Sequence, residues 1–305
     1  MFNLDVSTVS GEIDFSTATS VSEVLDFIHC PQYWANKYVF QRQEIAPIAK
    51  PLRVGTAVHE VLEQFMLGRD KLGVDPVSTR LTEPEDDLIG EVMDLLMDEW
   101  YGVHVLGQPK WTAVISTEEP LALYIGGHLV VGTPDAVVEY NGKLWHVQHK
   151  TLAQSKPVAT FIKLVARSYH EALYHWMLRA KFPDREIGGT MLNIVRKMSR
   201  KRAQEDPTQG LWLEWLAIDN DKSARALKDL TYYLDLMADQ REILDTKRHR
   251  DMPFVPQNRK MCAGTFGNSL CTYYHVCQDN GQILWDDRLF QETDPHERYD
   301  GKSIS

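Results

Sequence analysis

The stretch Gly132–Thr151, GTPDAVVEYNGKLWHVQHKT, decides the fold of this chain. Near its middle stands Asn141-Gly142, a dipeptide typical of two-residue hairpin turns because both residues readily adopt positive φ. Such a turn pairs Tyr140 with Lys143 and each earlier residue with the next one along. The stretch therefore predicts a two-stranded antiparallel hairpin with a fixed register.

Three polar residues of this hairpin are expected to gather at one place. Counted outward from the turn, Asp135 falls opposite Gln148. Because side chains alternate between the faces of a strand, Gln148 and Lys150 share a face with Asp135, at a cross-strand separation of roughly 5 Å between Asp135 and Gln148. An acid, an amide and a lysine at this spacing predict a site for a divalent metal. The alternative is an ordinary hairpin with a polar face.

The composition limits which classes of protein this chain can belong to. The chain has 305 residues, of which 43% are hydrophobic, so it is long enough for a substantial core. No stretch approaches the apolar length of a membrane span, and the first residues lack the pattern of a signal peptide, so we expect a globular protein of the cytoplasm. Because the net charge is -10, any nucleic acid must be bound by a local basic patch.

The first helix is expected to follow a loosely attached lead-in, residues 1–19. Ser20 and Glu23 have capping-box spacing, and apolar residues then recur at helical intervals. Pro31 should end this helix directly after Cys30 and leave the cysteine exposed at the end of the element.

A second helix is predicted over Arg53–Arg69, where apolar residues form one stripe. His59 and Glu63 lie four residues apart at the border of that stripe. A histidine at such a border is either a half-buried structural residue or a ligand.

Two further segments precede the hairpin. Glu83–Tyr101 is predicted to be an acidic helix with a solvated face, and Thr112–Val131 alternates well enough for two strands. Glu118 and Glu119, between these strands, are weaker candidates for an additional acidic group.

After the hairpin, Ala159–Phe182 is predicted to form one long helix. Lys163, Arg167, His170 and Tyr174 recur at intervals of four, three and four, so they line up on one face. This face is either solvated or contacts DNA through two cations and two hydrogen-bonding side chains.

A basic patch lies after the first of two predicted strands, Ile187–Arg196 and Leu211–Ile218. Five cations concentrated in an acidic protein favour contact with a phosphate backbone, and a solvated loop is the alternative. They are Arg196, Lys197, Arg200, Lys201 and Arg202. A predicted helix over Asp219–Lys247 ends in a second basic cluster of Lys247, Arg248 and Arg250.

The cysteines form a third candidate site. Four cysteines in a chain of this size argue against a disulfide framework and leave metal binding, catalysis or burial. Cys262, Cys271 and Cys277 stand close together in the sequence, whereas Cys30 is far upstream. Four thiolates suit either an iron-sulfur cluster or structural zinc. Residues 286–305 are predicted to be a polar, disordered tail.

The hairpin resembles the PD-(D/E)xK nuclease superfamily, in which an Asp at a strand start and a carboxylate two residues before a Lys bind Mg²⁺ beside a scissile phosphate. Pro134-Asp135 matches the first half of this pattern. The second half reads QHK, with Gln148 where Asp or Glu is expected, and a neutral carbonyl oxygen ligates a hard cation more weakly. The resemblance implies Asp135, Gln148 and Lys150 as catalytic residues.

The order of motifs is similar to that of the RecB-like branch. Gly55, His59 and Glu63 match its GxxxHxxxE segment, whose His is a metal ligand. Tyr174 matches the Tyr of a Gln-xxx-Tyr motif on the helix after the catalytic Lys, while His170 replaces the Gln. The resemblance implies His59 as a metal ligand and Tyr174 as a further catalytic residue.

The cysteine order is similar to that of the iron-sulfur members of this branch, which include the CRISPR-associated exonuclease and the AddB nuclease domain. One Cys precedes the nuclease core and three follow it, and the last pair, Cys271 and Cys277, has the usual separation. The gap from Cys262 to Cys271 is longer than usual. The resemblance implies a 4Fe-4S cluster that clasps the N- and C-terminal segments, with structural zinc as the alternative.

For the whole chain, the resemblance implies one α/β domain over residues 20–285 with a restriction-endonuclease-like fold, a mixed central sheet flanked by helices. It implies a DNA exonuclease, rather than an endonuclease, that uses Mg²⁺ or Mn²⁺ held by His59, Asp135, Gln148 and the carbonyl of His149. Single-stranded DNA or DNA with free ends is the expected substrate, in recombination, repair or processing, with recombination or CRISPR-type protein partners. The alternative is a catalytically weakened nuclease fold that serves as a DNA-binding or partner-binding module.

Overall fold

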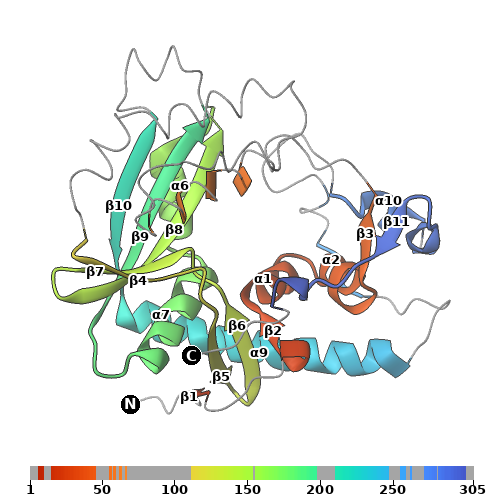
Figure 1. Ribbon diagram of the computed structural model, residues 1–305. Coiled ribbons are helices and arrows are strands. Elements are labelled where there is room, and N and C mark those ends of the chain that lie inside the picture. Colours follow the sequence, from red (N-terminus) through yellow and green to blue (C-terminus); the bar gives the residue numbers. More distant parts are fainter. Residues whose placement is uncertain are drawn as a thin grey trace. The chain divides into compact units, whose positions relative to one another are not determined.

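The computed structural model describes residues 6–9, 15–45, 55–56, 58–59, 62–63, 66, 111–153, 155–197, 210–246, 255–258, 262, 271–279 and 281–299 (Figure 1). The chain divides into two compact units. The first unit comprises Met1–Pro47, Ala122–Gly132 and Ala224–Ser305, and the second comprises Ile48–Leu121 and Thr133–Ser223. The acidic helix predicted over Glu83–Tyr101 lies outside the described residues, and the single domain predicted over residues 20–285 stays a prediction.

A five-stranded mixed sheet forms the centre of the second unit (Figure 1). Its strands run in the order β10 (Leu211–Ala217), β9 (Ile187–Lys197), β8 (Lys143–Ala153), β7 (Ala136–Tyr140) and β4 (Ala113–Thr117). Strands β8 and β9 are parallel, and the other neighbouring pairs are antiparallel. The predicted mixed sheet flanked by helices is thus confirmed for this unit.

The hairpin of β7 and β8 has the predicted register. Asn141 and Gly142 adopt φ angles of 51° and 73°, the left-handed conformation that a two-residue turn between twisted strands requires. Tyr140 pairs with Lys143, and Ala136 pairs with Val147. One step further along, this register puts residue 135 opposite residue 148, as the sequence indicated.

Two helices, and not one, follow the hairpin. The helix predicted over Ala159–Phe182 is divided into α6 (Val158–Val165) and α7 (Tyr169–Lys181). The division occurs because Ser168, the residue before α7, is extended, with φ -77° and ψ 148°. The predicted shared face was therefore wrong, because the break separates Lys163 and Arg167 from His170 and Tyr174.

The central sheet is covered on both faces. Leu152 and Ile194 pack against α6, and the hydroxyl of Thr190 on the same face donates to Glu171 of α7. The opposite face packs against Met66 through Ala136, Val138, Trp145, Val147 and Met191. Strand β8 is consequently buried along most of its length, polar residues included.

The polar residues in the middle of β8 are unusual for a core strand. His146, Gln148 and His149 are exposed by only 1%, 4% and 3%. Buried polar side chains cost free energy unless they find partners, so such residues are seldom kept without a role. These three side chains therefore depend on polar partners within the second unit.

The first unit contains a small sheet with strand order β1 (Val6–Thr8), β5 (Leu121–Ile125), β6 (His128–Gly132) and β2 (Thr19–Ser20). Three strands therefore occupy the region around Thr112–Val131 where two were predicted. The missed turn is Gly126-Gly127, whose φ angles of 57° and 84° suit glycine. The prediction of a loosely attached lead-in was wrong for β1 and β2, because both pair with strands of this sheet.

The first helix begins as predicted. Ser20 caps α1 (Val21–His29), and its hydroxyl accepts a hydrogen bond from the backbone N–H of Glu23 at 3.1 Å. Pro31 then opens α2 (Pro31–Trp34) directly after Cys30. Cys30 is buried, with 8% exposure, so the prediction of an exposed cysteine was wrong. The reason is that Pro31 starts a new helix at N1, where its missing N–H costs nothing, and the chain stays packed on both sides of the cysteine.

The C-terminal segment is folded between residues 281 and 299. The predicted polar tail was wrong for this part because apolar residues anchor it: Phe290 and Tyr299 are 5% and 1% exposed. In addition, His296 lies 3.1 Å from the carboxylate of the fully buried Glu23, which also accepts from Trp34 at 2.9 Å. The remaining elements are η1 (Phe15–Thr17), η2 (Ala35–Val39), β3 (Arg42–Glu44), α9 (Asn220–Thr246), α10 (Tyr274–Gln278), η6 (Gln282–Trp285), β11 (Phe290–Glu292), which pairs with β3, and η7 (Glu297–Tyr299).

Helix α9 agrees with the helix predicted over Asp219–Lys247. Among the described helices, none combines the length and the apolar character that a membrane span needs.

Candidate functional site

Asp135 stands immediately before the first residue of β7. Its Oδ2 accepts a hydrogen bond from the backbone N–H of His149 at 2.5 Å. Its Oδ1 lies 3.4 Å from Nδ1 of His59, a residue in helical conformation. Two of the predicted metal ligands, Asp135 and His59, are therefore in contact.

Glu118 joins this pair from the turn after β4. Its backbone N–H donates to the carbonyl of Asp135 at 3.2 Å, and its φ of 47° is uncommon for a residue with a side chain. One ligand atom each from His59, Glu118 and Asp135 lie within 4.8 Å of one another. Glu119, the other weak candidate, points elsewhere and bonds Lys181 at 2.5 Å.

The electrostatic setting keeps Asp135 ionised. Burial alone would raise its pKa, but the hydrogen bond with His59 and the nearby charges of His149, His59 and Lys150 together lower the pKa well below its usual value. For His149, burial lowers the pKa to about 4 against the opposing pull of Asp135. At neutral pH the carboxylate of Asp135 is therefore anionic and the nearby imidazole of His149 is neutral.

Gln148 and Lys150, the other two predicted residues of the hairpin, stand close by. The amide nitrogen of Gln148 lies 2.6 Å from Nδ1 of His170, and its buried carbonyl oxygen has no hydrogen-bond partner among the described residues. Lys150 is half-buried, and its charge contributes to lowering the pKa of Asp135. The role of Gln148 and of the His149 carbonyl as metal ligands stays a prediction.

Tyr174 has a buried position, with 5% exposure. Its hydroxyl donates to the carbonyl of Thr133 at 3.0 Å, and its ring lies 4.6 Å from that of His170. Tyr174 therefore contacts the segment leading to Asp135, and its predicted catalytic and DNA-binding roles stay predictions.

This geometry can be compared with known proteins. A model of the PD-(D/E)XK nuclease superfamily matches residues 18–278 of the chain. The chain belongs to the PD-(D/E)XK nuclease superfamily. Members of this superfamily usually use Mg²⁺ or Mn²⁺, and the group of His59, Glu118 and Asp135 could hold such an ion.

Solved structures include a similar chain, the crystal structure of a "Putative exonuclease" from Eubacterium rectale. It is 10% identical, with a TM-score of 0.48, and the similarity covers 82% of this nuclease and 94% of that chain. No curated protein matches the sequence.

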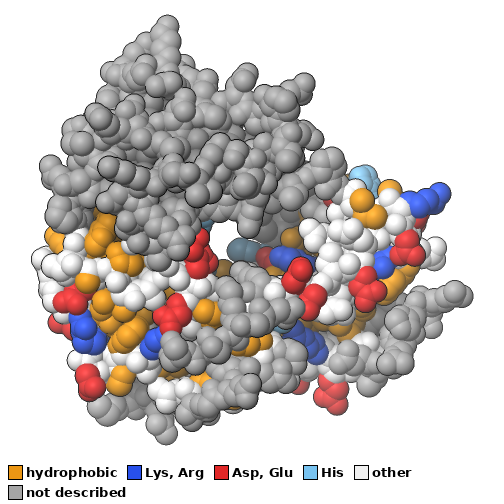
Figure 2. Space-filling view, viewed as in Figure 1, with side chains coloured by type: hydrophobic (Ala, Val, Ile, Leu, Met, Phe, Trp, Pro, Cys, Tyr) orange, Lys and Arg blue, Asp and Glu red, His pale blue; other side chains and the backbone are white. Residues whose placement is uncertain are grey.

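The predicted DNA-binding cations of the nuclease are only partly described. Lys163 and Arg167 are exposed, on α6 and directly after it. Arg196, near the end of β9, lies over the ring of Trp212 at 5.8 Å, and Lys197 is the last residue of that strand. On the face shown in Figure 2, acidic and basic side chains of the described residues are interspersed. Arg200, Lys201, Arg202, Lys247, Arg248 and Arg250 lie outside the described residues.

The four cysteines of the nuclease belong to the first unit, and none forms a disulfide. Cys30 Sγ accepts from the backbone N–H of Asn258 at 3.5 Å, and Cys262 Sγ lies 3.8 Å from the carbonyl of the same residue. The backbone N–H of Cys271 donates to the carbonyl of Cys262 at 3.0 Å. Burial and the charges of the other three thiols raise the pKa of Cys277 to about 12. The four thiols therefore share one neighbourhood.

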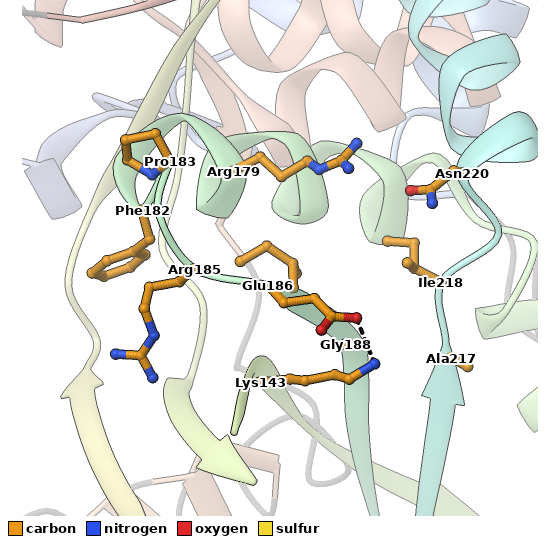
Figure 3. Close-up of a pocket in the computed structure, with 11 residues that line it drawn as sticks. Lys143, Arg179, Phe182, Pro183, Arg185, Glu186, Gly188, Ala217, Ile218 and Asn220 are labelled. Carbon is orange, nitrogen blue, oxygen red and sulfur yellow. Dashed lines mark ion pairs between the residues drawn. The ribbon is translucent and has the colours of Figure 1, made fainter. Parts of the chain in front are cut away.

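A separate cavity of about 510 Å³ lies in the second unit, at the end of α7 and the start of β9 (Figure 3). It is lined by Arg179 and Arg185, and by Lys143, which pairs with Glu186 at 2.5 Å. None of the predicted catalytic residues lines it.

Proposed function

We propose that this protein is a metal-dependent deoxyribonuclease that acts as an exonuclease on single-stranded DNA or DNA with free ends. One observation carries the proposal: ligand atoms of His59, Glu118 and Asp135 converge within 4.8 Å, with the cation of Lys150 close enough to lower the pKa of Asp135. We place the enzyme in the cytoplasm, in DNA recombination, repair or processing.

The donor set fits a hard divalent cation. Two carboxylates and one imidazole are ligands that Mn²⁺ accepts and that Mg²⁺ tolerates together with water. The superfamily pattern has two acids, and here Gln148 stands in the place of one of them. Glu118, from the turn after β4, would supply the missing negative charge beside Asp135. When bound, a metal here would activate water and neutralise charge on the phosphate.

The remaining residues of the site prepare this chemistry. Lys150 would orient the attacking water and stabilise the negative charge that develops on the phosphate. The backbone N–H of His149 fixes one oxygen of Asp135, which leaves the other oxygen turned toward His59. Tyr174 holds the carbonyl of Thr133, two residues before Asp135, and so acts as a positioning residue.

DNA would be held through its phosphates. Lys163 and Arg167 are exposed on the segment that covers the central sheet, and Arg196 and Lys197 lead into the predicted basic patch. Each cation that neutralises a phosphate releases a counterion and strengthens binding at low salt. These four residues, with Arg200, Lys201, Arg202, His170 and Tyr174, are the predicted DNA-binding set, and the burial of Tyr174 favours an indirect role for it.

The cysteines are proposed to hold a 4Fe-4S cluster. Cys30 and Cys262 both contact Asn258, and Cys277 interacts with the other three thiols, so four thiols without disulfides fit a thiolate-bound group. Its role would be structural, because it would join the α1–α2 junction to the segment of Cys262–Cys277. Structural zinc is the alternative for the same four ligands.

A second candidate function is a DNA-binding or partner-binding module that no longer cuts. One observation favours it: Gln148 stands in the place of an acid, and its amide is engaged with His170 at 2.6 Å. Such a protein would keep DNA affinity without hydrolysis.

The test is incubation of pure protein with end-labelled single-stranded and double-stranded DNA in Mn²⁺, Mg²⁺ or EDTA. We expect shortening from the ends with either metal and none with EDTA or with Asp135→Ala or Lys150→Ala. A folded wild-type protein that binds DNA and is inert with every divalent metal would leave the second candidate in place. Protection of a circular substrate separates exonuclease from endonuclease.

A further inference from the structure

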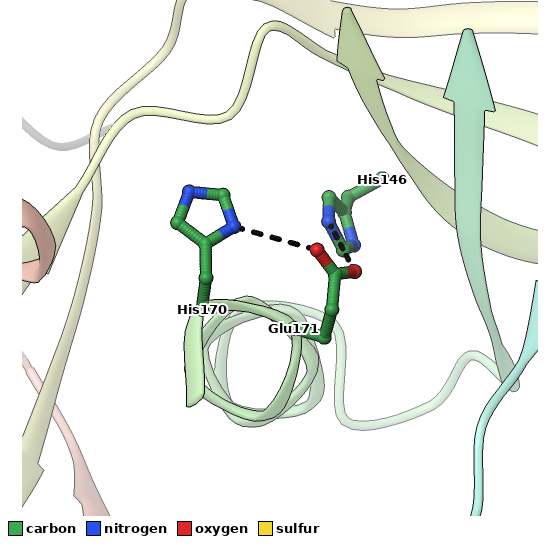
Figure 4. Close-up of side chains that lie close together, drawn as sticks. All are labelled: His146, His170 and Glu171. Atoms are coloured by element: carbon green, nitrogen blue, oxygen red, sulfur yellow. Dashed lines mark ion pairs between the residues drawn. The ribbon is translucent and has the colours of Figure 1, made fainter. Parts of the chain in front are cut away.

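A second cluster of ligand-type side chains lies beside the candidate site (Figure 4). His146 comes from β8, whereas His170 and Glu171 come from the first turn of α7. Nε2 of His146 lies 3.2 Å from Oε2 of Glu171, and Nδ1 of His170 lies 3.5 Å from Oε1 of the same carboxylate. One ligand atom from each residue lies within 4.8 Å of the others. The proposed nuclease chemistry uses none of the three as a metal ligand.

The spacing of these atoms is that of a coordination shell. Zinc binds imidazole nitrogen and carboxylate oxygen at about 2.0–2.2 Å, so two ligands of a tetrahedral site are roughly 3.4 Å apart. The two nitrogen–oxygen distances around Glu171, 3.2 and 3.5 Å, match this value. The two imidazoles face different oxygens of the carboxylate, an arrangement that fits one ion if both oxygens of Glu171 bind it.

The environment favours a cation. His146 is only 1% exposed, and the side chain of Glu171 is 13% exposed. Thr190 donates to Oε2 of Glu171, which is the kind of outer contact that orients a ligating carboxylate. Oε1 of Glu171 has no hydrogen-bond partner among the described residues. Within the described residues, the contact of this buried oxygen is the imidazole of His170 at 3.5 Å, and a bound cation would give it a second partner.

We propose that His146, His170 and Glu171 form a transition-metal site, separate from the group of His59, Glu118 and Asp135. Two imidazoles and one carboxylate select Zn²⁺ and its neighbours such as Co²⁺ over Mg²⁺, which prefers oxygen ligands and keeps its water. The site joins β8 to the start of α7, so an ion there would fix the helix that carries Tyr174. It does not depend on DNA hydrolysis.

Gln148 lies at the edge of this proposed site. Its amide nitrogen is 2.6 Å from Nδ1 of His170. The oxygen and nitrogen of an amide are assigned from contacts, and the opposite orientation puts the carbonyl oxygen beside His170. In either orientation the 2.6 Å contact is a hydrogen-bond distance, shorter than the roughly 3.4 Å between two ligands of one ion, so Gln148 is a neighbour that orients His170 and is not counted as a ligand.

The test is Co²⁺ binding to the full chain with its cysteine site loaded as purified, followed by visible absorption. An excess of Mg²⁺ is added to compete at the carboxylate-rich group of His59, Glu118 and Asp135. We expect one equivalent of Co²⁺ whose spectrum lacks thiolate-to-metal bands, displaced by one equivalent of Zn²⁺. His146→Gln and Glu171→Gln should each weaken this binding by more than about tenfold, since each removes a ligand. Asp135→Asn is the matched control and should keep the same Co²⁺ affinity in the presence of Mg²⁺.

Three outcomes overturn the site: equal Co²⁺ affinity in wild type and Glu171→Gln, a spectrum showing thiolate ligation only, or loss of binding in Asp135→Asn alone. If Glu171→Gln does not fold, His170→Asn, at a less buried position, provides the same comparison. Because the measured quantity is metal affinity, a failure of the nuclease assay and a failure of this site are separate results.

Discussion

The backbone N–H of Glu118 lies 3.2 Å from the carbonyl oxygen of Asp135, so the two acids of the candidate metal centre are tied together through the main chain. Glu118 holds a φ of 47°, which costs roughly 1 kcal/mol for a residue other than glycine. Local strain of this kind persists where surrounding contacts fix it, and it often accompanies a functional side chain.

Glu118→Gln tests whether its carboxylate is a ligand. Removing one negative charge from the shell should raise the Mn²⁺ concentration needed for half-maximal hydrolysis by about tenfold, since each charged oxygen ligand strengthens binding of a hard cation. Glu119→Gln is the matched control, because Glu119 is adjacent in sequence and bonds Lys181 instead. An equal metal requirement in both variants would remove Glu118 from the ligand set.

Tyr174→Phe removes the hydrogen bond from its hydroxyl to the carbonyl of Thr133. The loss should lower the free energy of unfolding by about 1 kcal/mol, measured in urea, and lower kcat by displacing Asp135. Tyr232→Phe serves as the control, because Tyr232 is 60% exposed and should change neither quantity. Unchanged kcat in a destabilised Tyr174→Phe would limit the hydroxyl to a role in stability.

His175 gives the second unit an acid-sensitive core. It is 1% exposed, its Nδ1 lies 3.0 Å from Ser223 Oγ, and burial, with the charge of Arg179, lowers its pKa to about 3. The folded pKa is below the unfolded value near 6.5, so protonation favours the unfolded chain. Stability from the neutral imidazole is fully present above about pH 6.5 and is lost as pH falls toward 3, by about 1.4 kcal/mol per pH unit.

The measurement is urea unfolding of wild type and His175→Gln at about pH 7 and about pH 5. Carboxylates contribute the same pH dependence to both proteins, so the comparison isolates the histidine. Wild type should lose more stability than the variant between the two pH values. Equal losses would show that His175 is not the group responsible.

Lys163→Gln combined with Arg167→Gln tests the exposed cations near α6. If both residues neutralise phosphates, the slope of log binding constant against log salt should become shallower by about 0.9 for each lost contact. Lys222→Gln is the control, since Lys222 is exposed on α9 and pairs with Asp219 at 3.0 Å. A slope equal to that of the control would assign Lys163 and Arg167 to solvated surface.

The features predicted correctly from the sequence are those that short-range chemistry determines. The turn at Asn141-Gly142 fixes the register of β7 and β8, and the hydroxyl of Ser20 fixes the start of α1. The break before α7 was missed because apolar periodicity continues across Ser168 and conceals its extended backbone. The sequence did not predict that the C-terminal segment is folded. Its two buried aromatic residues, Phe290 and Tyr299, are isolated within a polar stretch.

The candidate site divides in the same way. The hairpin predicts that Asp135 and Lys150 lie near each other, whereas the contact between Glu118 and Asp135, formed where Glu118 has a positive φ, is not contained in the hairpin pattern. His146 and Glu171 are far apart in sequence and meet because α7 packs on β8. A pattern of spacing within one element does not contain that contact.

Cys30→Ser tests the proposed cysteine cluster, whose four thiols come from distant parts of the first unit's sequence. Wild-type protein purified without oxygen should be brown and should bleach on oxidation, as thiolate-bound iron-sulfur centres do. Loss of one ligand should release the segment of Cys262–Cys277 from the α1–α2 junction, so the variant should be less soluble and cut faster by protease, because binding energy of such a group is folding energy. If the wild-type protein is colourless and holds one zinc per chain, the site is assigned to zinc and not to an iron-sulfur cluster. Metal-free wild type and a Cys30→Ser variant of equal protease resistance would contradict both assignments.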